Sequence, residues 1–585
     1  MTRLDCRLWN LYEEHPMNDR RSLQLVQGAL LGRLSRRQVL TAGLRLGLPT
    51  PVIAALMEAA REASAAPVRS ATLGRRRTQE GGDTFTIIVT GGADDVDPHS
   101  TYSTNGSAIC YGVYDMLIKY KGESTSEYEP MLAESWEASP DNTVFTFKIK
   151  PNVQFHDGTT CDAAAVKASF TRFFELGLGP ADNVLKRFID SPDAIEAVDA
   201  TTVRFSTPQE EPLFLAAMAS NYGPYVVSPV AVEQNKTDDD PWAHNWFLAN
   251  AVGTGPYRVV ENSPSERVVL ERFENYHGGW EGEHFNQVVF RIVEENAVRR
   301  QLLENGEGDA LTYDLTPEDM EALKAAPNLQ VLTYPSTRVN WATMNAVRLK
   351  TADVRRGFSF AFPYDDVMNG VYRGLVTRSG PIPSTVTGYD PNVFLYRTDL
   401  DQAKQLILSG GFAEGDSFDF IVTAGDEIGK SVAQLFQANL QQIGFELEIS
   451  ELDTTTIENI VYGDQPVEEK PIFVDWAWWP DFNDPWNQLK ANFVESAIGG
   501  GGSNPGGYVN DRFEQLMNEA ENADPTRLAE LMKEAQNILT EQDPPAIYYG
   551  EALYYTILGK DIQGFVANPL YLSAYPCWNM SRAQG

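Results

Sequence analysis

The pattern of apolar residues between positions 431 and 452 constrains the fold of this chain more than any other feature. The segment SVAQLFQANLQQIG carries one apolar helical stripe, formed by Val432, Leu435, Phe436, Leu440 and Ile443. Gly444 is suited to end that helix in a left-handed turn. In the next segment, FELEISEL, apolar and polar residues alternate as they do in a half-buried strand. A helix followed at once by a strand predicts one unit of an α/β fold.

The rest of the chain places this unit in one of at least two lobes. From about residue 295, helical patterns alternate with short strand patterns, as in a sheet covered on both faces. The chain before that point is rich in strand patterns, with strands expected at 84–90 and 143–150, helices at 108–120 and 162–176, and a hairpin at 253–279. Residues 546–558 return to a strand pattern. A chain of 585 residues can form several cores, so we expect it to cross between two lobes at least twice.

The charge of the chain excludes one large class of partners. There are 81 acidic and 47 basic residues, which give a net charge of -34. Such a surface repels phosphate backbones and anionic lipid head groups. We therefore expect no nucleic-acid partner, and we interpret most of the acidic residues as a solvated surface.

The N-terminal segment resembles a twin-arginine export signal. Ser35, Arg36 and Arg37 begin the pattern Ser-Arg-Arg-x-apolar-Leu, and an apolar run and small residues follow it as far as Ala65. The apolar run is too short and too interrupted to be a stable membrane span. We expect residues 1–65 to be a cleaved signal segment, 66–83 to be a linker, and the mature protein to lie in the periplasm or outside the cytoplasmic membrane.

Three cysteines remain after such cleavage, namely Cys110, Cys161 and Cys577. An odd number allows one disulfide at most. The sequence leaves open whether Cys110 and Cys161 pair. No cysteine follows the alanine cluster near Ala65, so we expect no lipid anchor.

Motifs of known enzyme classes are missing from the sequence. It contains no Gly-x-Ser-x-Gly, His-Glu-x-x-His or paired Cys-x-x-Cys motif, and no Gly-Lys-Ser/Thr after a glycine loop. The six histidines do not fall at the spacing that a metal site favours. We therefore expect no catalytic residues, no resident metal and no cofactor.

The segment WAWWPDFNDP, residues 476–485, is the strongest candidate for a binding site. If a strand covers 472–479, Trp476 and Trp478 share one face and Trp479 points the other way. Pro480 ends the strand, and Asp481 follows it. A cation desolvated in a closed site needs a carboxylate, and tryptophan faces also attract cations. An uncharged sugar would stack on the same rings, and the alternative for the tryptophans is packing in the core.

Several ordered blocks of sequence resemble the solute-binding proteins of peptide and nickel ABC transporters, extracellular type, family 5. The blocks are LAESW (132–136), TFKIK (146–150), FHDG (155–158), GTGPY (253–257), NGEGDA (305–310), ADVRRGFSFAFPYDDV (352–367) and DLDQAKQLILSGGF (399–412). The resemblance runs from about residue 84 to the end. His277 stands where the family usually has tryptophan, and AFPYDD stands where many members have Ala-Ile-Asp. We interpret GTGPY as a structural turn whose glycines permit unusual backbone angles.

The resemblance implies an α/β fold of the two-lobed periplasmic-binding-protein type II, with an extra subdomain in the first lobe. It predicts lobe 1 at 84–115, 230–298 and 546–585, its subdomain at 116–229, and lobe 2 at 299–545. It also predicts a monomeric receptor, not an enzyme, that closes on a small solute and delivers it to the membrane permease subunits of an ABC transporter. A peptide is the expected solute, with a sugar, an opine or a metal complex as alternatives.

The resemblance also assigns candidate ligand-binding residues. Asp481 matches an aspartate that pairs with the α-ammonium group of the ligand in peptide-binding relatives. The other candidates are the three tryptophans of the WAWW segment and, by their position in the chain, Asn345, Tyr102, Tyr222 and Tyr364. Two other functions stay open: an exported glycoside hydrolase using carboxylates such as Asp481 and Asp484, and a carrier of metal complexes or oligosaccharides. For a metal carrier, His156, His244 or His284 would have to enter the site.

Overall fold

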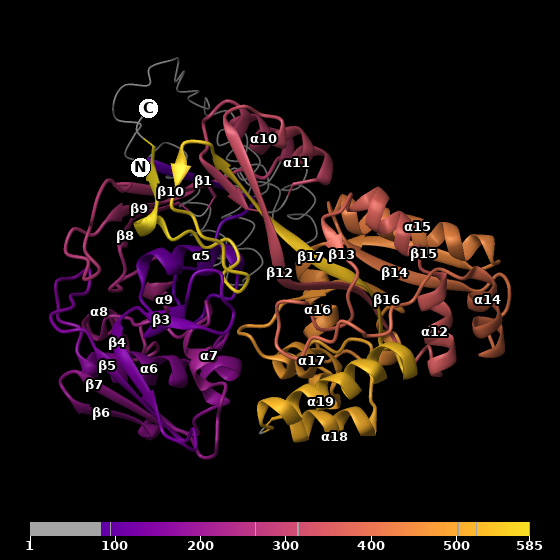
Figure 1. Ribbon diagram of the computed structural model, residues 1–585, viewed down its shortest axis with the longest axis horizontal. Helices are drawn as coiled ribbons and strands as arrows, with labels where there is room; N and C mark the ends of the chain where they lie inside the picture. The colour runs from indigo at the N-terminus through magenta and orange to yellow at the C-terminus, as the bar shows by residue number, and fades with distance from the viewer. Residues whose placement is uncertain are drawn as a thin grey trace, which may run out of the picture. The chain divides into compact units, whose positions relative to one another are not determined.

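Two long antiparallel strands, β12 (Leu329–Met344) and β17 (Ala546–Gly559), form the middle of an 11-stranded sheet (Figure 1). The computed structural model describes residues 84–583 except 94, 264, 313–314, 500–501 and 522. The sheet order is β15-β14-β16-β12-β17-β11-β1-β10-β9-β8, with β13 paired to β17. The predicted signal segment and linker lie outside the described residues.

The pairing of β12 with β17 divides this sheet into two halves. Residues 329–335 of β12 pair with 559–553 of β17, and residues 339–343 pair with 551–546. The register shifts between Pro335 and Val339 and again between Asn340 and Trp341. Irregularities of this kind bend a strand and increase its twist. We call the half built on β1 and β8–β11 the first lobe and the half built on β14–β16 the second lobe, so both strands connect the two lobes.

The first lobe has a mixed sheet in which β1 is parallel to β10 and β8 and β9 form the predicted hairpin. Its strands are β1 (Thr84–Val89), β8 (Tyr257–Ser263), β9 (Arg267–Arg272), β10 (Gln287–Ile292) and β11 (Ala310–Thr312). Its helices are α5 (Thr104–Val113), α8 (Pro229–Asn235), α9 (His244–Phe247), α10 (Asn296–Glu304) and α11 (Pro317–Lys324). The helix expected at 108–120 is shorter, because α5 ends at Val113 and residues 118–120 form a strand.

The glycines of the turn GTGPY were expected to permit unusual backbone angles, but the structure shows another reason for them. Neither Gly253 nor Gly255 has a positive φ. A Cβ atom at Gly253 would lie 2.4 Å from the Val113 carbonyl oxygen, and one at Gly255 would lie 2.5 Å from the Val113 carbonyl carbon. The glycines therefore permit close approach to the end of α5 and are not needed for unusual backbone angles.

A separate four-stranded antiparallel sheet of order β4-β5-β7-β6 belongs to the chain between α5 and α8. Its strands are β4 (Ala133–Ala138), β5 (Val144–Ile149), β6 (Ile195–Asp199) and β7 (Thr202–Ser206), and α6 (Ala163–Leu176) packs on it (Figure 1). The smaller elements are β2 (Ile118–Tyr120), β3 (Tyr128–Pro130), α7 (Phe214–Met218), η1 (Asp182–Lys186) and η2 (Pro192–Ala194). We call this part the subdomain.

The second lobe contains the αβ unit that the sequence predicted. Helix α15 (Glu427–Gln442) precedes β15 (Glu446–Leu452), and Gly444 between them has φ of 94°. The other strands are β13 (Val376–Thr377), β14 (Ser417–Thr423) and β16 (Phe473–Trp478). The helices are α12 (Ala352–Ala361), α13 (Tyr364–Asp366), α14 (Leu400–Ser409), α16 (Thr454–Tyr462), α17 (Pro485–Phe493), α18 (Asp511–Ala520) and α19 (Pro525–Asn537). Short turns of helix are η3 (Val367–Val371), η4 (Val467–Glu469), η5 (Glu495–Ala497) and η6 (Ile538–Gln542).

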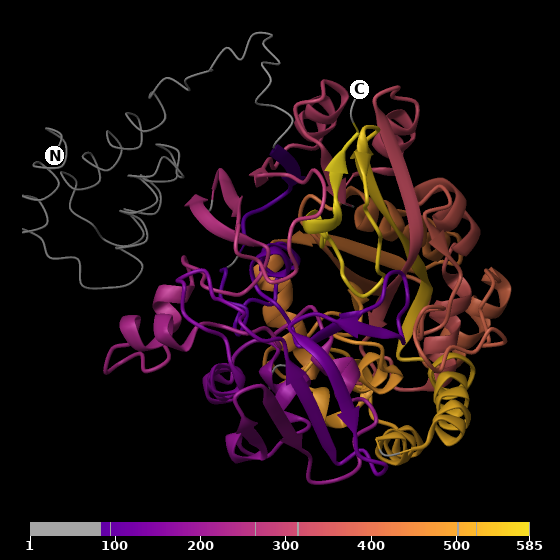
Figure 2. The ribbon, with the colours of Figure 1, turned by 60° about the vertical axis from the view of Figure 1, so that its left-hand side comes forward.

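The C-terminal end of the chain is attached to the first lobe. β18 (Ile562–Gln563) pairs with β19 (Ser581–Arg582), and η7 (Cys577–Asn579) lies between them. Arg582 donates hydrogen bonds to the Thr84 carbonyl oxygen at 3.2 Å and to Asp309 at 2.8 Å. Figure 2 shows this C-terminal part in yellow, next to the long strand β12.

The hydrophobic clusters follow the two lobes. One cluster joins the first lobe to the subdomain, and two others cover the two faces of the second-lobe sheet. Residues of α10 and α11, such as Leu302 and Leu323, pack with Ile88 of β1. The predicted boundary between the two lobes at 298–299 stays a prediction. The packing of α10 and α11 on β1 favours a boundary later in the chain.

The three described cysteines are buried, and Cys110 and Cys161 do not form a disulfide with each other in this structure. Burial raises the pKa values of the Cys161 and Cys577 thiols far above their usual range. Buried thiols of this kind are poor nucleophiles. Within residues 84–583, no described helix has both the length and the apolar character needed to cross a membrane.

Candidate functional site

Asp481 lies between the end of β16 and the start of α17, and it is in contact with the first lobe. Its side chain is buried, with 4% of the residue exposed. The phenol of Tyr102, from the loop after β1, donates a hydrogen bond of 2.6 Å to Oδ1. The Asp481 N–H donates to the Asn487 side-chain oxygen at 3.1 Å, and Ser220 Oγ donates to the Asp481 carbonyl oxygen at 2.8 Å. The backbone and one carboxylate oxygen are therefore held in place.

The other oxygen of this carboxylate has no partner. Oδ2 is buried and accepts no hydrogen bond from any residue in the described part of the chain. Burial raises the pKa of Asp481 from 3.8 to about 6, and the hydrogen bond from Tyr102 opposes that shift only in part. A buried carboxylate without a counter-charge favours a ligand that brings a positive charge or a hydrogen-bond donor.

Three other predicted residues surround Asp481. The rings of Tyr102 and Tyr222 meet edge to face with their centres 5.2 Å apart. The indole N–H of Trp479 donates to the Tyr222 hydroxyl at 3.5 Å. Tyr222 is buried, whereas Tyr102 is 40% exposed. Residues from the first lobe and from the end of β16 therefore meet here, and this meeting point is our candidate site.

Sequence reasoning missed two residues of this group. Asn183 of the subdomain donates to the Tyr102 hydroxyl at 3.4 Å. The guanidinium carbon of Arg338 lies 5.7 Å from the centre of the Trp479 ring, and its Nε donates to Asn340 at 2.9 Å. Arg338 lies in the irregular stretch of β12 between the lobes. No motif in the sequence marks either residue.

Trp476 and Trp478 pack in the second lobe. They are half-buried against a cluster that includes Trp341 and Leu489, from β12 and α17. In the register of the sheet, Trp476 is opposite Trp341 and Trp478 is opposite Val339. Their environment matches the core-packing interpretation.

Asn345 and Tyr364 are also outside the group around Asp481. The Asn345 amide donates to the carbonyl oxygens of Val467 at 2.8 Å and Lys470 at 3.2 Å, and its oxygen accepts the Arg348 N–H at 3.0 Å. Tyr364 is buried in the core on the other face of the sheet, beneath the guanidinium of Arg378. Asn345 therefore holds a turn of the second lobe.

A second polar group lies at the carboxyl end of the parallel strands in the second lobe, where α/β sheets commonly bind ligands. Asp475 of β16 accepts a hydrogen bond from the Tyr549 phenol. Burial and the nearby Asp426 raise the pKa of Asp475 to about 7. Asp426 caps α15, and a Cβ atom on Gly429 would lie 2.5 Å from Asp475 Oδ2 and 2.8 Å from Asp426 Oδ2. The two carboxylates thus converge on the backbone of Gly429.

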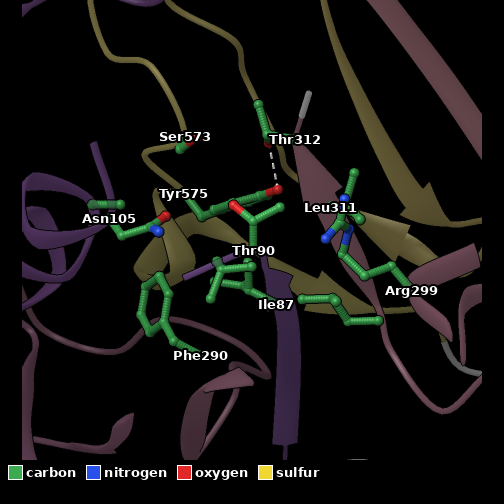
Figure 3. Close-up of a pocket in the computed structure, with 12 residues that line it drawn as sticks. Ile87, Thr90, Asn105, Phe290, Arg299, Leu311, Thr312, Ser573 and Tyr575 are labelled. Atoms are coloured by element: carbon green, nitrogen blue, oxygen red, sulfur yellow. Dashed lines mark hydrogen bonds between the residues drawn. The ribbon is translucent and has the colours of Figure 1, made fainter. Parts of the chain in front are cut away.

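A cavity in the first lobe is too small for a solute. It lies at the end of β1, and Thr90, Asn105, Thr312 and Tyr575 are among its lining residues (Figure 3). The Thr312 and Tyr575 hydroxyl groups are 2.5 Å apart. The cavity admits water-sized spheres over a volume of about 10 Å³, which is room for roughly one water molecule. We therefore place the candidate site around Asp481 and not in this cavity.

The positions of Asp484 and of three histidines do not support the glycoside hydrolase or the metal carrier that the sequence left open. Asp484, the suggested catalytic partner of Asp481, accepts a hydrogen bond from Arg187 at 2.8 Å and caps α17. His156 and His284 bond to backbone carbonyl oxygens, and His244 lies beside Asp97. Among the described residues, no three or more His, Cys, Asp or Glu side chains are arranged to hold a metal ion.

Comparisons with known proteins agree with the fold. "Probable D,D-dipeptide-binding periplasmic protein DdpA" of Escherichia coli strain K12 is 30% identical over 514 residues, covering 85% of this chain and 94% of that protein. "Heme-binding protein A" of Haemophilus influenzae is 27% identical and covers 81% of this chain and 87% of that protein. The solved structure of the periplasmic binding protein DppA from Helicobacter pylori, in complex with the peptide STSA, has a TM-score of 0.74 at 23% identity, covering 86% of this chain and 98% of that one.

These likenesses confirm the predicted two-lobed periplasmic-binding-protein fold of type II. Residues 127–500, well over half of the chain, match the family described as "Bacterial extracellular solute-binding proteins, family 5 Middle". Together with the relative that is 30% identical over most of its length, this match establishes the class of protein. The chain belongs to the bacterial extracellular solute-binding proteins of family 5, which are receptors for solutes and not enzymes.

Proposed function

We propose that this protein is a periplasmic receptor that closes on a peptide and delivers it to the permease subunits of an ABC transporter. One relative is named for binding D,D-dipeptides, and one solved neighbour holds a peptide. The observation that carries the proposal is the buried carboxylate of Asp481, whose Oδ2 has no partner among the described residues. The α-ammonium group of a peptide supplies both the positive charge and the hydrogen-bond donors that this oxygen lacks.

The surrounding residues support recognition of an ammonium group in particular. Tyr102 donates to Oδ1 and leaves Oδ2 as the acceptor for a ligand. The ring of Tyr222 packs against Tyr102, and Trp479 donates to the Tyr222 hydroxyl, so the residue that holds the carboxylate belongs to a group of aromatic rings, which attract cations as well. A ligand carboxylate would meet Asp481 with like charge, so this end of the site favours the amino end of a peptide.

Native mass spectrometry of the freshly exported protein tests this proposal first, because it identifies any solute that the protein carries. Calorimetry then compares that peptide with its N-acetylated form. We expect the free amine to bind and the acetylated form to bind at least tenfold more weakly. A carried solute without an amino group, or equal affinities for the two forms, would refute the assignment of Asp481. Trp476→Phe, in the core cluster, is the matched control and should leave the ratio of affinities unchanged.

We also propose amended lobe boundaries. The register shifts of β12 lie between 335 and 341, and the pairing partners on β17 there are residues 553–548. The packing of α10 and α11 on β1 supports assigning residues 299–334 to the first lobe. The division is then 84–115, 230–334 and 553–583 for the first lobe, with 116–229 as its subdomain. The second lobe covers 341–548, and limited proteolysis of the intact protein can check these limits.

For the N-terminal segment we propose export by the twin-arginine route and cleavage near Ala65. The periplasmic relative supports the compartment, and Arg36 and Arg37 support the route. We propose that the mature receptor is a monomer. Arg36→Lys with Arg37→Lys should abolish export, as measured by cell fractionation, and sedimentation of the secreted protein reports its mass.

A further inference from the structure

The segment that carries Asp481 is docked onto the first lobe and its subdomain. We call residues 481–486 the docking segment. Ser220 Oγ donates to the Asp481 carbonyl oxygen at 2.8 Å. The Asn483 N–H donates to the Tyr120 hydroxyl at 3.2 Å, and its side-chain amide donates to the Thr125 carbonyl oxygen at 2.8 Å. Three hydrogen bonds between protein groups therefore join Asp481 and Asn483 of the second lobe to the subdomain of the first.

Phe482 is inserted into the core of the first lobe. Its side chain is fully buried, and it belongs to the hydrophobic cluster that joins the first lobe to the subdomain. The other described buried members of that cluster lie within residues 85–310 and 558–580, which makes Phe482 a contribution from the second lobe. Its ring centre lies 6.1 Å from that of Phe188 in the subdomain. Separation of the lobes would expose this ring to water.

A buried ion pair lies next to Phe482. Arg187 of the subdomain donates to Asp484 Oδ2 at 2.8 Å, and the two side chains are 8% and 0% exposed. The guanidinium carbon lies 3.7 Å from the centre of the Trp486 ring and 5.9 Å from that of Phe482. Removing one partner of a buried pair leaves an uncompensated charge, which is strongly unfavourable unless water can reach it.

The docking segment is equally well fixed to the second lobe. Asp484 Oδ1 accepts the Trp486 N–H at 2.9 Å and caps α17. Asn483 Oδ1 accepts the Thr387 N–H at 2.8 Å. The segment therefore moves with α17, and opening of the lobes must withdraw Phe482 and break the pair between Arg187 and Asp484.

We propose that the docking segment is a latch in which Phe482, Arg187 and Asp484 hold the two lobes together through contacts between protein groups alone. The latch sets the fraction of closed molecules before any solute binds. It also sets the rate at which the lobes part to release a solute. This inference goes beyond the solute receptor function and does not depend on which solute is carried.

Distance measurements between spin labels on the two lobes test the latch. Labels are attached at Val198→Cys in the subdomain and Leu408→Cys in α14, both exposed positions, while the three described native cysteines are buried. Carried solute is removed by unfolding and refolding the protein. We expect mainly the short, closed distance in the labelled parent. Arg187→Leu and Phe482→Ala should each raise the ratio of open to closed molecules by about tenfold or more, equivalent to about 1.4 kcal/mol.

Controls separate the latch from general effects of mutation. Arg204→Leu removes an exposed pair with Glu196 inside the subdomain and should leave the distances unchanged. Asp484→Asn keeps a good helix cap and removes the charge. In the double variant Arg187→Leu with Asp484→Asn, residue 484 carries no unpaired charge, so its open fraction should be lower than in Arg187→Leu.

Hydrogen exchange on the unmutated, solute-free protein gives an answer even if a variant fails to fold. The Asn483 amide should be protected to nearly the same extent as amides of α17, because it donates to Tyr120 across the lobes. Rapid exchange at Asn483, a labelled parent that is mainly open, or folded Phe482→Ala and Arg187→Leu variants that stay as closed as the parent would each overturn the latch.

Discussion

Replacing Asp481 by asparagine should stabilise the protein in a way that depends on pH. Burial raises the pKa of this carboxyl from 3.8 to about 6, and one unit corresponds to about 1.4 kcal/mol. The ionised group therefore lowers the free energy of unfolding of the solute-free protein by about 3 kcal/mol at pH 8. Asparagine keeps the acceptor for Tyr102 and removes the charge. Its buried amide leaves donors unbonded, which costs about 1 kcal/mol at every pH.

The sign of the effect follows from linkage. A carboxyl whose pKa is raised in the folded state contributes stability that is fully present below the unfolded value of 3.8 and is lost as the pH rises through 6. The variant should thus exceed the parent by about 2 kcal/mol at pH 8, and this advantage should disappear as the pH falls from 6 towards 4. Urea unfolding of solute-free protein at a series of pH values measures the difference directly.

The test rests on how the difference in free energy of unfolding between variant and parent changes with pH, because the cost of burying the asparagine amide does not depend on pH. Asp239→Asn, at an exposed position, removes the same charge from the surface and should give a flat profile close to zero. A flat profile for Asp481→Asn, or an advantage that grows as the pH falls, would show that Asp481 is not a buried carboxylate without a counter-charge.

Three further results are expected. Tyr102→Phe removes the hydrogen bond that lowers the pKa of Asp481. When Asp481→Asn is compared with Asp481 in this background, the pH midpoint of the difference in free energy of unfolding should rise by about one unit. Asn345→Ala removes hydrogen bonds that hold the turn at 467–471, and urea unfolding should show a loss of about 2 kcal/mol with little change in solute affinity. The affinity of the parent for an amine-bearing peptide should fall by up to about tenfold per pH unit below 6, because protonated Asp481 no longer attracts the ammonium group; calorimetry at pH 7, 6 and 5 measures it.

Local patterns predicted the regular elements well. The αβ unit of α15 and β15, the hairpin of β8 and β9, and the strand at 546–558 depend on neighbouring residues, and all are present. The predicted helix at 108–120 is too long, because the chain after Val113 leaves α5 to form β2. The lobe boundaries stay a prediction, and because β12 and β17 each continue through both lobes, the end of a strand does not mark the place where one lobe gives way to the other.

The candidate site was only partly predictable for a related reason. Asp481 and Trp479 stand in a conspicuous segment, and the resemblance indicated Tyr102 and Tyr222 by position. Asn345 occupies a similarly suggestive position, yet its amide is used by a turn more than 100 residues away in the sequence. Arg338 reaches the site through an irregularity in β12, and such irregularities have no clear sequence pattern. Contacts between distant segments decide which polar residues are free to meet a ligand.

The order of residues in the docking segment connects recognition with closure. Asp481 and Phe482 are adjacent, so the carboxylate proposed to bind the solute cannot leave the first lobe without drawing the buried ring with it. A solute shifts an equilibrium only by its differential affinity for the two states. An ammonium group that pairs with Asp481 offsets the cost of burying this carboxylate, which is about 3 kcal/mol relative to an exposed one, and it favours closure to the extent that opening exposes the carboxylate to water. A bound ammonium group therefore prolongs the closed conformation by compensating the buried charge of Asp481. The contacts of the latch between the lobes are the same for every solute.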